Sequence, residues 1–93
     1  MITKLYAIYD RKSGLYGRIF HETNDATAVR FFNTSFSTPQ AQAIGQDCEL
    51  YCLGTYSDYM GKITALEKPA FVVCYGQPYN PDVLADDLVE VKA

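Results

Sequence analysis

A helical pattern of apolar residues appears once in the first two thirds of this 93-residue chain, between residues 25 and 36. Val29, Phe32 and Phe36 recur at the spacing that places side chains on one face of a helix. Asn24 precedes the pattern and is a favourable N-cap, and Asp25 would place a carboxylate at the positive end of the helix dipole. The pattern therefore predicts one main amphipathic helix over 25–36.

Short runs rich in strand-forming residues flank this helix and are separated by polar turns. Residues 4–9 and 15–20 enclose a polar turn that ends at Gly14, which predicts a hairpin. Residues 49–56 and 62–66 predict a second hairpin, and the continuous apolar run 70–75 predicts a fifth, well-buried strand.

Two segments between or after these elements are less regular. Residues 37–47 could form a short helix that begins at Pro39 and stops at Gly45, or an ordered loop. Residues 77–93 contain two prolines and then apolar residues at helical spacing, so they predict a short acidic helix or an extended tail. We expect an α+β domain over residues 1–76, with an antiparallel sheet of about five strands in the order ββαβββ, followed by the acidic tail 77–93.

The predicted strands carry apolar side chains on both faces, although a sheet with one solvated face normally alternates apolar and polar residues. One helix covers only part of a five-stranded sheet, so the other face should meet a second copy of the chain, the tail, or a ligand that stacks on aromatic rings. We therefore expect a homodimer through a sheet face. A sheet that closes into a small barrel is the alternative.

Charge is distributed unevenly along a chain whose formal net charge is −3. Four cations against one carboxylate give residues 1–21 a net charge of +3, whereas four carboxylates against one lysine give residues 77–93 a net charge of −3. The composition also includes eight Tyr and five Phe but no Trp. Basic and aromatic residues together in the first hairpin are the most informative feature for a choice of partner.

Cations beside flat aromatic rings on a sheet are typical of single-stranded nucleic-acid binding, because phosphates contact the charges and bases stack on the rings. A solvated hairpin edge, on which lysine and arginine discourage aggregation, would look similar. If the first hairpin pairs regularly, the strand residues of this set share one face. The candidate nucleic-acid-binding residues are Lys4, Tyr6, Arg11, Lys12, Tyr16 and Arg18.

No residues point to catalysis, a metal or a cofactor. Cys48 and Cys52 would lie about 13 Å apart on an extended strand, too far for one zinc ion or a disulfide. His21 has no serine or cysteine neighbour in a recognisable catalytic arrangement. No run is long enough for a membrane helix and the first residues do not form a signal peptide. Three cysteines, an odd number, do not form a disulfide framework and fit a reducing cytosol, so we expect a protein of the cytoplasm.

Three blocks of sequence resemble a known family: K-L-Y-A-I-Y-D-R-K-S-G-L-Y, E-T-N-D-A-T-A-V-R-F-F and E-L-Y-C-L-G-T-Y-S-D-Y-M-G-K-I. In sequence and spacing they are similar to the small nonstructural protein of gokushovirus-type microviruses, over residues 3–66. These viruses are tailless bacteriophages with circular single-stranded DNA. The family is usually described as DNA-binding and thought to act when replication turns to the packaging of single strands. The resemblance implies no particular site residues.

The resemblance and the residues together predict a nonstructural phage protein in the host cytoplasm that binds single-stranded DNA during replication or packaging. The alternative is a protein–protein adaptor of host or viral replication or assembly machinery that does not bind DNA; an inhibitor of host defence is a further possibility. The acidic tail could fold over the basic hairpin and compete with DNA, or bind a replication or capsid partner. In the first case, removal of residues 77–93 should strengthen DNA binding.

Overall fold

The computed structural model describes residues 1–79, so the predicted acidic helix within 80–93 lies outside the described residues. It confirms an α+β fold with an antiparallel sheet and a main helix over the predicted stretch. The elements, in chain order, are β1 (Ile2–Asp10), β2 (Leu15–Tyr16), β3 (Phe20–Glu22), α1 (Asp25–Thr34), α2 (Pro39–Gly45), β4 (Cys48–Ser57) and β5 (Lys62–Cys74).

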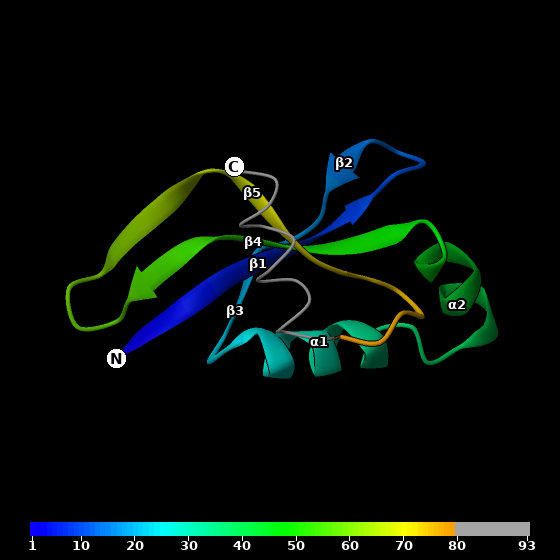
Figure 1. The fold of residues 1–93 in the computed structure, drawn as a ribbon, viewed down its shortest axis with the longest axis horizontal. Helices are drawn as coiled ribbons and strands as arrows, with labels where there is room; N and C mark the ends of the chain where they lie inside the picture. Colours follow the sequence, from blue (N-terminus) through cyan, green and yellow to red (C-terminus); the bar gives the residue numbers. More distant parts are fainter. Residues whose placement is uncertain (80–93) are drawn as a thin grey trace.

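The sheet has five strands in the order β2-β1-β4-β5, and β3 pairs with β1 on the same side as β2. β2 pairs with the end of β1 at Tyr9 and Asp10, and β3 pairs with its middle from Lys4 to Tyr6. The path ends at β5, which pairs only with β4 among the described residues, so the sheet is open rather than a closed barrel. Figure 1 shows the sheet strongly twisted, with α1 along one side and the β4–β5 hairpin projecting beyond it.

The predicted strand order ββαβββ is wrong, and the observed order is βββααββ. The predicted strand 15–20 divides into β2 and β3, because the chain leaves the regular ladder at Gly17, whose N–H donates to the carbonyl oxygen of Ile8 (2.8 Å). The predicted strands 62–66 and 70–75 form the single strand β5. Pro69 is accommodated within β5 because an edge strand can tolerate the missing N–H donor.

Side-chain caps define the starts of both helices. Asn24 Oδ1 accepts from the N–H of Thr27 (3.0 Å), and Thr27 Oγ1 accepts from the N–H of Asn24 (3.3 Å), which satisfies two donors at the start of α1. Thr38 Oγ1 accepts from the N–H of Ala41 (3.1 Å) in front of Pro39, so the segment 37–47 is a helix rather than a loop.

The hydrophobic core lies between α1 and one face of the sheet. Ala28, Val29 and Phe32 of α1 are buried against residues of β1, β4 and β5, of which Tyr6 and Leu50 are completely inaccessible to solvent. No helix of the described residues covers the opposite face, which we call the open face (Figure 1). The expectation that one helix shields only one side of the sheet is therefore met.

A close approach of two strands requires glycine at position 54. The registers of β1–β4 and β4–β5 both shift near this residue, as they do at β-bulges that increase the twist of a sheet. A Cβ atom on Gly54 would lie 2.2 Å from the carbonyl oxygen of Thr64 and 2.9 Å from Cα of Ala65. Gly54 therefore permits the register shift that shapes the sheet.

Candidate nucleic-acid interface

Four aromatic side chains from four different strands form a cluster on the open face. The ring centroid of Tyr9 lies 4.8 Å from that of Tyr16 and 6.0 Å from that of Tyr51, and Tyr16 lies 5.7 Å from Tyr51. Phe71 adds a fourth ring, 5.8 Å from Tyr51. Tyr16 is 45% exposed and the other three are half-buried, so the aromatic cluster presents ring surface to solvent.

Strand pairing brings these residues together. Tyr9 lies opposite Tyr16, and Tyr51 lies opposite Phe71. Residues directly opposite in an antiparallel pair share a face, and large rings at such positions are in contact. Ala7 is paired with Tyr51 and is buried, so its small side chain leaves room for the rings. The register of three strand pairs thus defines the aromatic cluster.

A carboxylate lies beside the aromatic cluster. Glu49 is paired with both Tyr9 and Cys74, and it accepts hydrogen bonds from the Tyr51 hydroxyl (3.0 Å, to Oε1) and from the Cys74 thiol (3.7 Å, to Oε2). Burial, followed by the hydrogen bond to Glu49, raises the pKa of Tyr51 to about 12. Burial and the charge of Glu49 also raise the pKa of the Cys74 thiol. Both groups therefore carry their protons at neutral pH and act as donors to Glu49.

Three of the predicted cations, which we call the rim cations, flank β2, the strand that carries Tyr16 of this cluster. Arg11 and Lys12 belong to the turn that follows β1, and Arg18 comes two residues after Tyr16; all three are exposed. The Arg11 guanidinium donates to the carbonyl oxygens of Gln46 (2.5 Å) and Asp47 (3.3 Å) just after α2. Within residues 1–79, Lys12 and Arg18 form no ion pair. Lys12 and Arg18 are therefore available to an anionic ligand.

The sequence predicts that Lys4 and Tyr6 share a face with Tyr16 and Arg18. In the structure, Lys4 and Tyr6 lie on the helix side of the sheet instead. The Tyr6 ring is fully buried, and its hydroxyl donates to Asp25 Oδ1 (2.5 Å); Lys4 Nζ donates to the same oxygen (3.0 Å). Tyr6 has no exposed ring on which a base could stack. The predicted shared face is wrong because the break at Gly17 ends the alternation on which it was based.

Sequence reasoning missed Tyr9, Tyr51 and Phe71 as site residues. Alternation did place Tyr9 on the face opposite Tyr6, and this was the available signal. The meeting of Tyr51 and Phe71 depends on a register shift in the β4–β5 pair between Leu50 and Tyr51. Such a shift has no local marker in the sequence.

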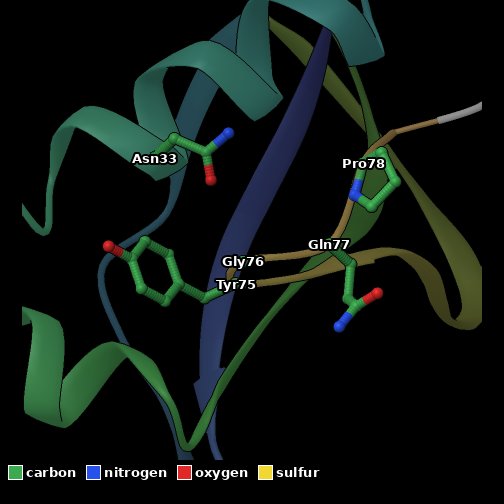
Figure 2. Close-up of a pocket in the computed structure, with 5 residues that line it drawn as sticks. All are labelled: Asn33, Tyr75, Gly76, Gln77 and Pro78. Carbon is green, nitrogen blue, oxygen red and sulfur yellow. The ribbon is translucent and has the colours of Figure 1, made fainter.

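A shallow hollow of about 490 Å³ lies elsewhere, between α1 and the segment after β5 (Figure 2). Asn33, Tyr75, Gly76, Gln77 and Pro78 line it, and none of them is charged. The sticks in Figure 2 show the amide of Asn33 and the ring of Tyr75 on one side and Pro78 and Gln77 on the other. This hollow contains neither the predicted cations nor a nucleophile with a neighbouring base, and we assign it no role.

Residues 1–79 contain neither a cluster of metal ligands nor a helix that could span a membrane. No group of three or more His, Cys, Asp or Glu side chains has the geometry to hold a metal ion. Cys48 and Cys52 are buried free thiols, as expected for extended neighbours on β4. None of the helices in this part of the chain has the length and apolar character needed to span a bilayer.

The described residues form a small α+β domain in which α1 packs on one face of the sheet and the other face carries aromatic rings. Residues 3–77 match the model of the family described as Phage ORF5 protein, and the chain belongs to this family. It is thus a phage protein, as the resemblance in the sequence implied at its coarsest level. Comparisons with curated proteins and with solved structures gave no match.

Proposed function

We propose that this phage protein binds single-stranded DNA through the open face of its sheet, as a nonstructural protein of a microvirus that acts in genome replication or packaging. The aromatic cluster would stack on bases, and Arg11, Lys12 and Arg18 would contact phosphates. This interface keeps Tyr16 and three of the four cations predicted from the sequence. It replaces Tyr6 by Tyr9, Tyr51 and Phe71, and it leaves Lys4 to its ion pair with Asp25.

The observation that carries the proposal is a cluster of rings on a sheet face that no helix covers, together with exposed cations on both sides of β2 along the chain. Stacking of a base on an aromatic side chain contributes about 1–3 kcal/mol and tolerates any base, because every base has a π-face. In a duplex these base faces are already stacked on one another. The aromatic cluster therefore suits single strands better than double strands.

The distribution of charge favours attraction of DNA to one part of the surface rather than to the molecule as a whole. The formal net charge of −3 repels DNA at long range, but the exposed cations of the first hairpin flank the strand that carries Tyr16. Counterions are released only from phosphates that cations neutralise, so the local arrangement decides the salt dependence. Three rim cations would give a slope of log K against log salt of about −2 for single strands.

A salt titration tests the proposal. Fluorescence anisotropy of a labelled single-stranded oligonucleotide, and of a duplex of equal length, would measure affinity from low to physiological salt. We expect tighter binding of the single strand, and a shallower slope when Lys12 and Arg18 are replaced by glutamine. The Lys62→Gln variant is the matched control, since Lys62 is an exposed cation on β5 away from the rim. No binding at low salt would overturn the proposal.

A second candidate function, the protein–protein adaptor, is favoured by the exposed apolar side chains at the projecting end of the β4–β5 hairpin. Met1, Ile2, Tyr59, Met60 and Ile63 are between 64% and 91% exposed there. The Met1 ammonium group lies 2.7 Å from Asp58 Oδ1, which holds the N-terminus against the hairpin turn. We call these five side chains the hairpin patch.

The occupant that we propose for the hairpin patch is a second copy of this chain, at a surface other than the sheet face through which the sequence predicts a homodimer. Ile63 shares a sheet face with Tyr56, whereas Ile2 shares the opposite face with Ser57, so one partner would contact only part of the hairpin patch and the dimer would be weaker than one with a standard interface of roughly 800 Å² per partner. Sedimentation of the chain and of an Ile63→Glu variant would test this. A wild-type monomer at all concentrations would reject the dimer, whereas DNA binding by that monomer would leave the first proposal intact.

A further inference from the structure

The most unusual feature of the proposed interface is its carboxylate. Glu49 lies on the open face beside Tyr9 and Tyr51, where the proposed function places a polyanion. A carboxylate at such a position repels phosphates, and its desolvation is costly unless it is paired or hydrogen-bonded. Within residues 1–79 no cation forms an ion pair with it. Two hydrogen bonds already stabilise this carboxylate, and its remaining lone pairs suit a ligand that offers hydrogen-bond donors.

Glu49 retains acceptor capacity in its present contacts. An ionised carboxylate has two oxygens with about four lone-pair sites and no donor. The Tyr51 hydroxyl occupies one site on Oε1, and the Cys74 thiol, a weak donor at 3.7 Å, occupies one on Oε2. Glu49 is half-buried, so part of its side chain remains accessible from the open face. The two donors also hold the carboxylate in one orientation.

We propose that Glu49 gives the interface a preference for bases with an exocyclic amino group, and in particular for cytosine over thymine. This inference rests on the proposed binding of single-stranded DNA to the same face. Glu49 is paired with Tyr9 and accepts from the Tyr51 hydroxyl, so a base stacked on either ring would have this carboxylate beside one of its edges. Cytosine presents the N4 amino group as a donor, whereas thymine presents the O4 carbonyl oxygen at the same position.

The chemistry of the two pyrimidines explains the direction of the preference. A carboxylate accepts from the N4 amino group of cytosine, which is a recognised pairing of acidic side chains with bases. Thymine offers only its N3–H, which lies between two carbonyl oxygens that repel the carboxylate. Both pyrimidines stack with similar area, so stacking does not separate them. One charge-assisted contact corresponds to a preference of about tenfold.

Affinities of the full chain for oligo(dC) and oligo(dT) of equal length, measured by anisotropy at one low salt concentration and at neutral pH, test this inference. We expect about tenfold tighter binding of oligo(dC). The Glu49→Gln variant should bind both with similar affinity, because its amide has a donor for the O4 atom of thymine as well as an acceptor for cytosine. The control Glu67→Gln removes the same charge from an exposed position on β5 and should keep the preference.

The outcomes separate this inference from the function on which it rests. If neither oligonucleotide binds, the proposed function fails and the inference fails with it. If the wild-type protein binds both equally, or if Glu49→Gln keeps the preference, the inference alone is overturned. Should Glu49→Gln fail to fold by circular dichroism, Glu49→Asp replaces it. That variant keeps the charge but withdraws the carboxylate by one methylene group, and it should lose most of the preference.

Discussion

The hydroxyl group of Tyr6 donates a hydrogen bond to the carboxylate of Asp25, with 2.5 Å between Oη and Oδ1. This contact joins the middle of β1 to the first turn of α1, where a carboxylate is favoured by the helix dipole. Lys4 donates to the same oxygen and the Tyr79 hydroxyl to the other, at 3.4 Å. Asp25 therefore links a strand, a helix and the segment that follows β5.

Replacement of Tyr6 by phenylalanine should destabilise the fold without changing DNA affinity. The variant keeps the buried ring but removes a hydrogen bond to a charged group, so we expect the free energy of unfolding to fall by about 1–2 kcal/mol. Urea denaturation measures this loss. Tyr59→Phe, at a position 91% exposed, is the control and should leave stability unchanged. If the variant folds normally but binds DNA more weakly, Tyr6 belongs to the interface after all.

Stability should decrease with pH in alkaline solution partly because of Tyr51. Burial and Glu49 raise its pKa to about 12 in the folded state, against about 10 in the unfolded chain. Between these values the unfolded state loses the proton that the folded state keeps, so unfolding is favoured as pH rises. Below pH about 10 the contribution is fully present. Urea unfolding across this window should show a shallower decline for Tyr51→Phe; equal slopes would contradict the assignment.

Gly54→Ala should be strongly destabilising. A Cβ at this position would lie 2.2 Å from the carbonyl oxygen of Thr64, so β4 and β5 must separate at the register shift. Overpacking of this kind costs about 1–3 kcal/mol or more. Thermal unfolding measures the effect, and Gly17→Ala is the matched control because the nearest atom to its Cβ would be the Ile8 carbonyl oxygen, at 3.6 Å. Equal melting temperatures for the two variants would refute the steric argument.

Tyr16→Ala should weaken binding of single-stranded DNA without unfolding the protein. Tyr16 is the most exposed ring of the aromatic cluster and packs on Tyr9 and Tyr51. Loss of one stacking platform should cost about 1–3 kcal/mol of binding free energy. Oligonucleotide anisotropy measures it, with Tyr59→Ala in the hairpin patch as the control. If the Tyr59 variant loses more affinity than the Tyr16 variant, DNA binds elsewhere.

The acidic residues after Tyr79 offer a test of competition with DNA. Replacement of Asp82, Asp86, Asp87 and Glu90 by their amides raises the formal net charge by four, from −3 to +1. We expect tighter binding of single strands at low salt, and a difference that shrinks as salt screens the charges. Unchanged or weaker binding would discard the competition hypothesis and leave a partner protein as the tail's target.

Local signals predicted the helix but not the faces of the first hairpin. Asn24 and the spacing of Val29 and Phe32 are visible in one short window, and the structure confirms the helix there. The position of Tyr16 relative to Phe20 required a regular strand between them, and the irregular turn at Gly17 places their side chains on opposite sides of the sheet. The alternation of side chains predicts which face a residue occupies only where the strand pairing continues without a break.

The sequence suggested the three cations that the proposed interface keeps, but only one of its four rings, Tyr16. Arg11, Lys12 and Arg18 are close in sequence to Tyr16, so their proximity needed no knowledge of the fold. Tyr51 and Phe71 join them through strand pairing across long stretches of chain, with registers set by bulges. Register is a property of the whole sheet, which is why neither residue could be chosen from the sequence.

The alternation of side chains along β1 has a consequence for how this protein can change over generations. Tyr6 and Tyr9 are three residues apart, yet one belongs to the core under α1 and the other to the open face. Substitutions at exposed outward positions such as Tyr16 disturb the packing under α1 less than substitutions at Tyr6 do. The exposed part of the open face can therefore change with less effect on stability than the face that packs under α1.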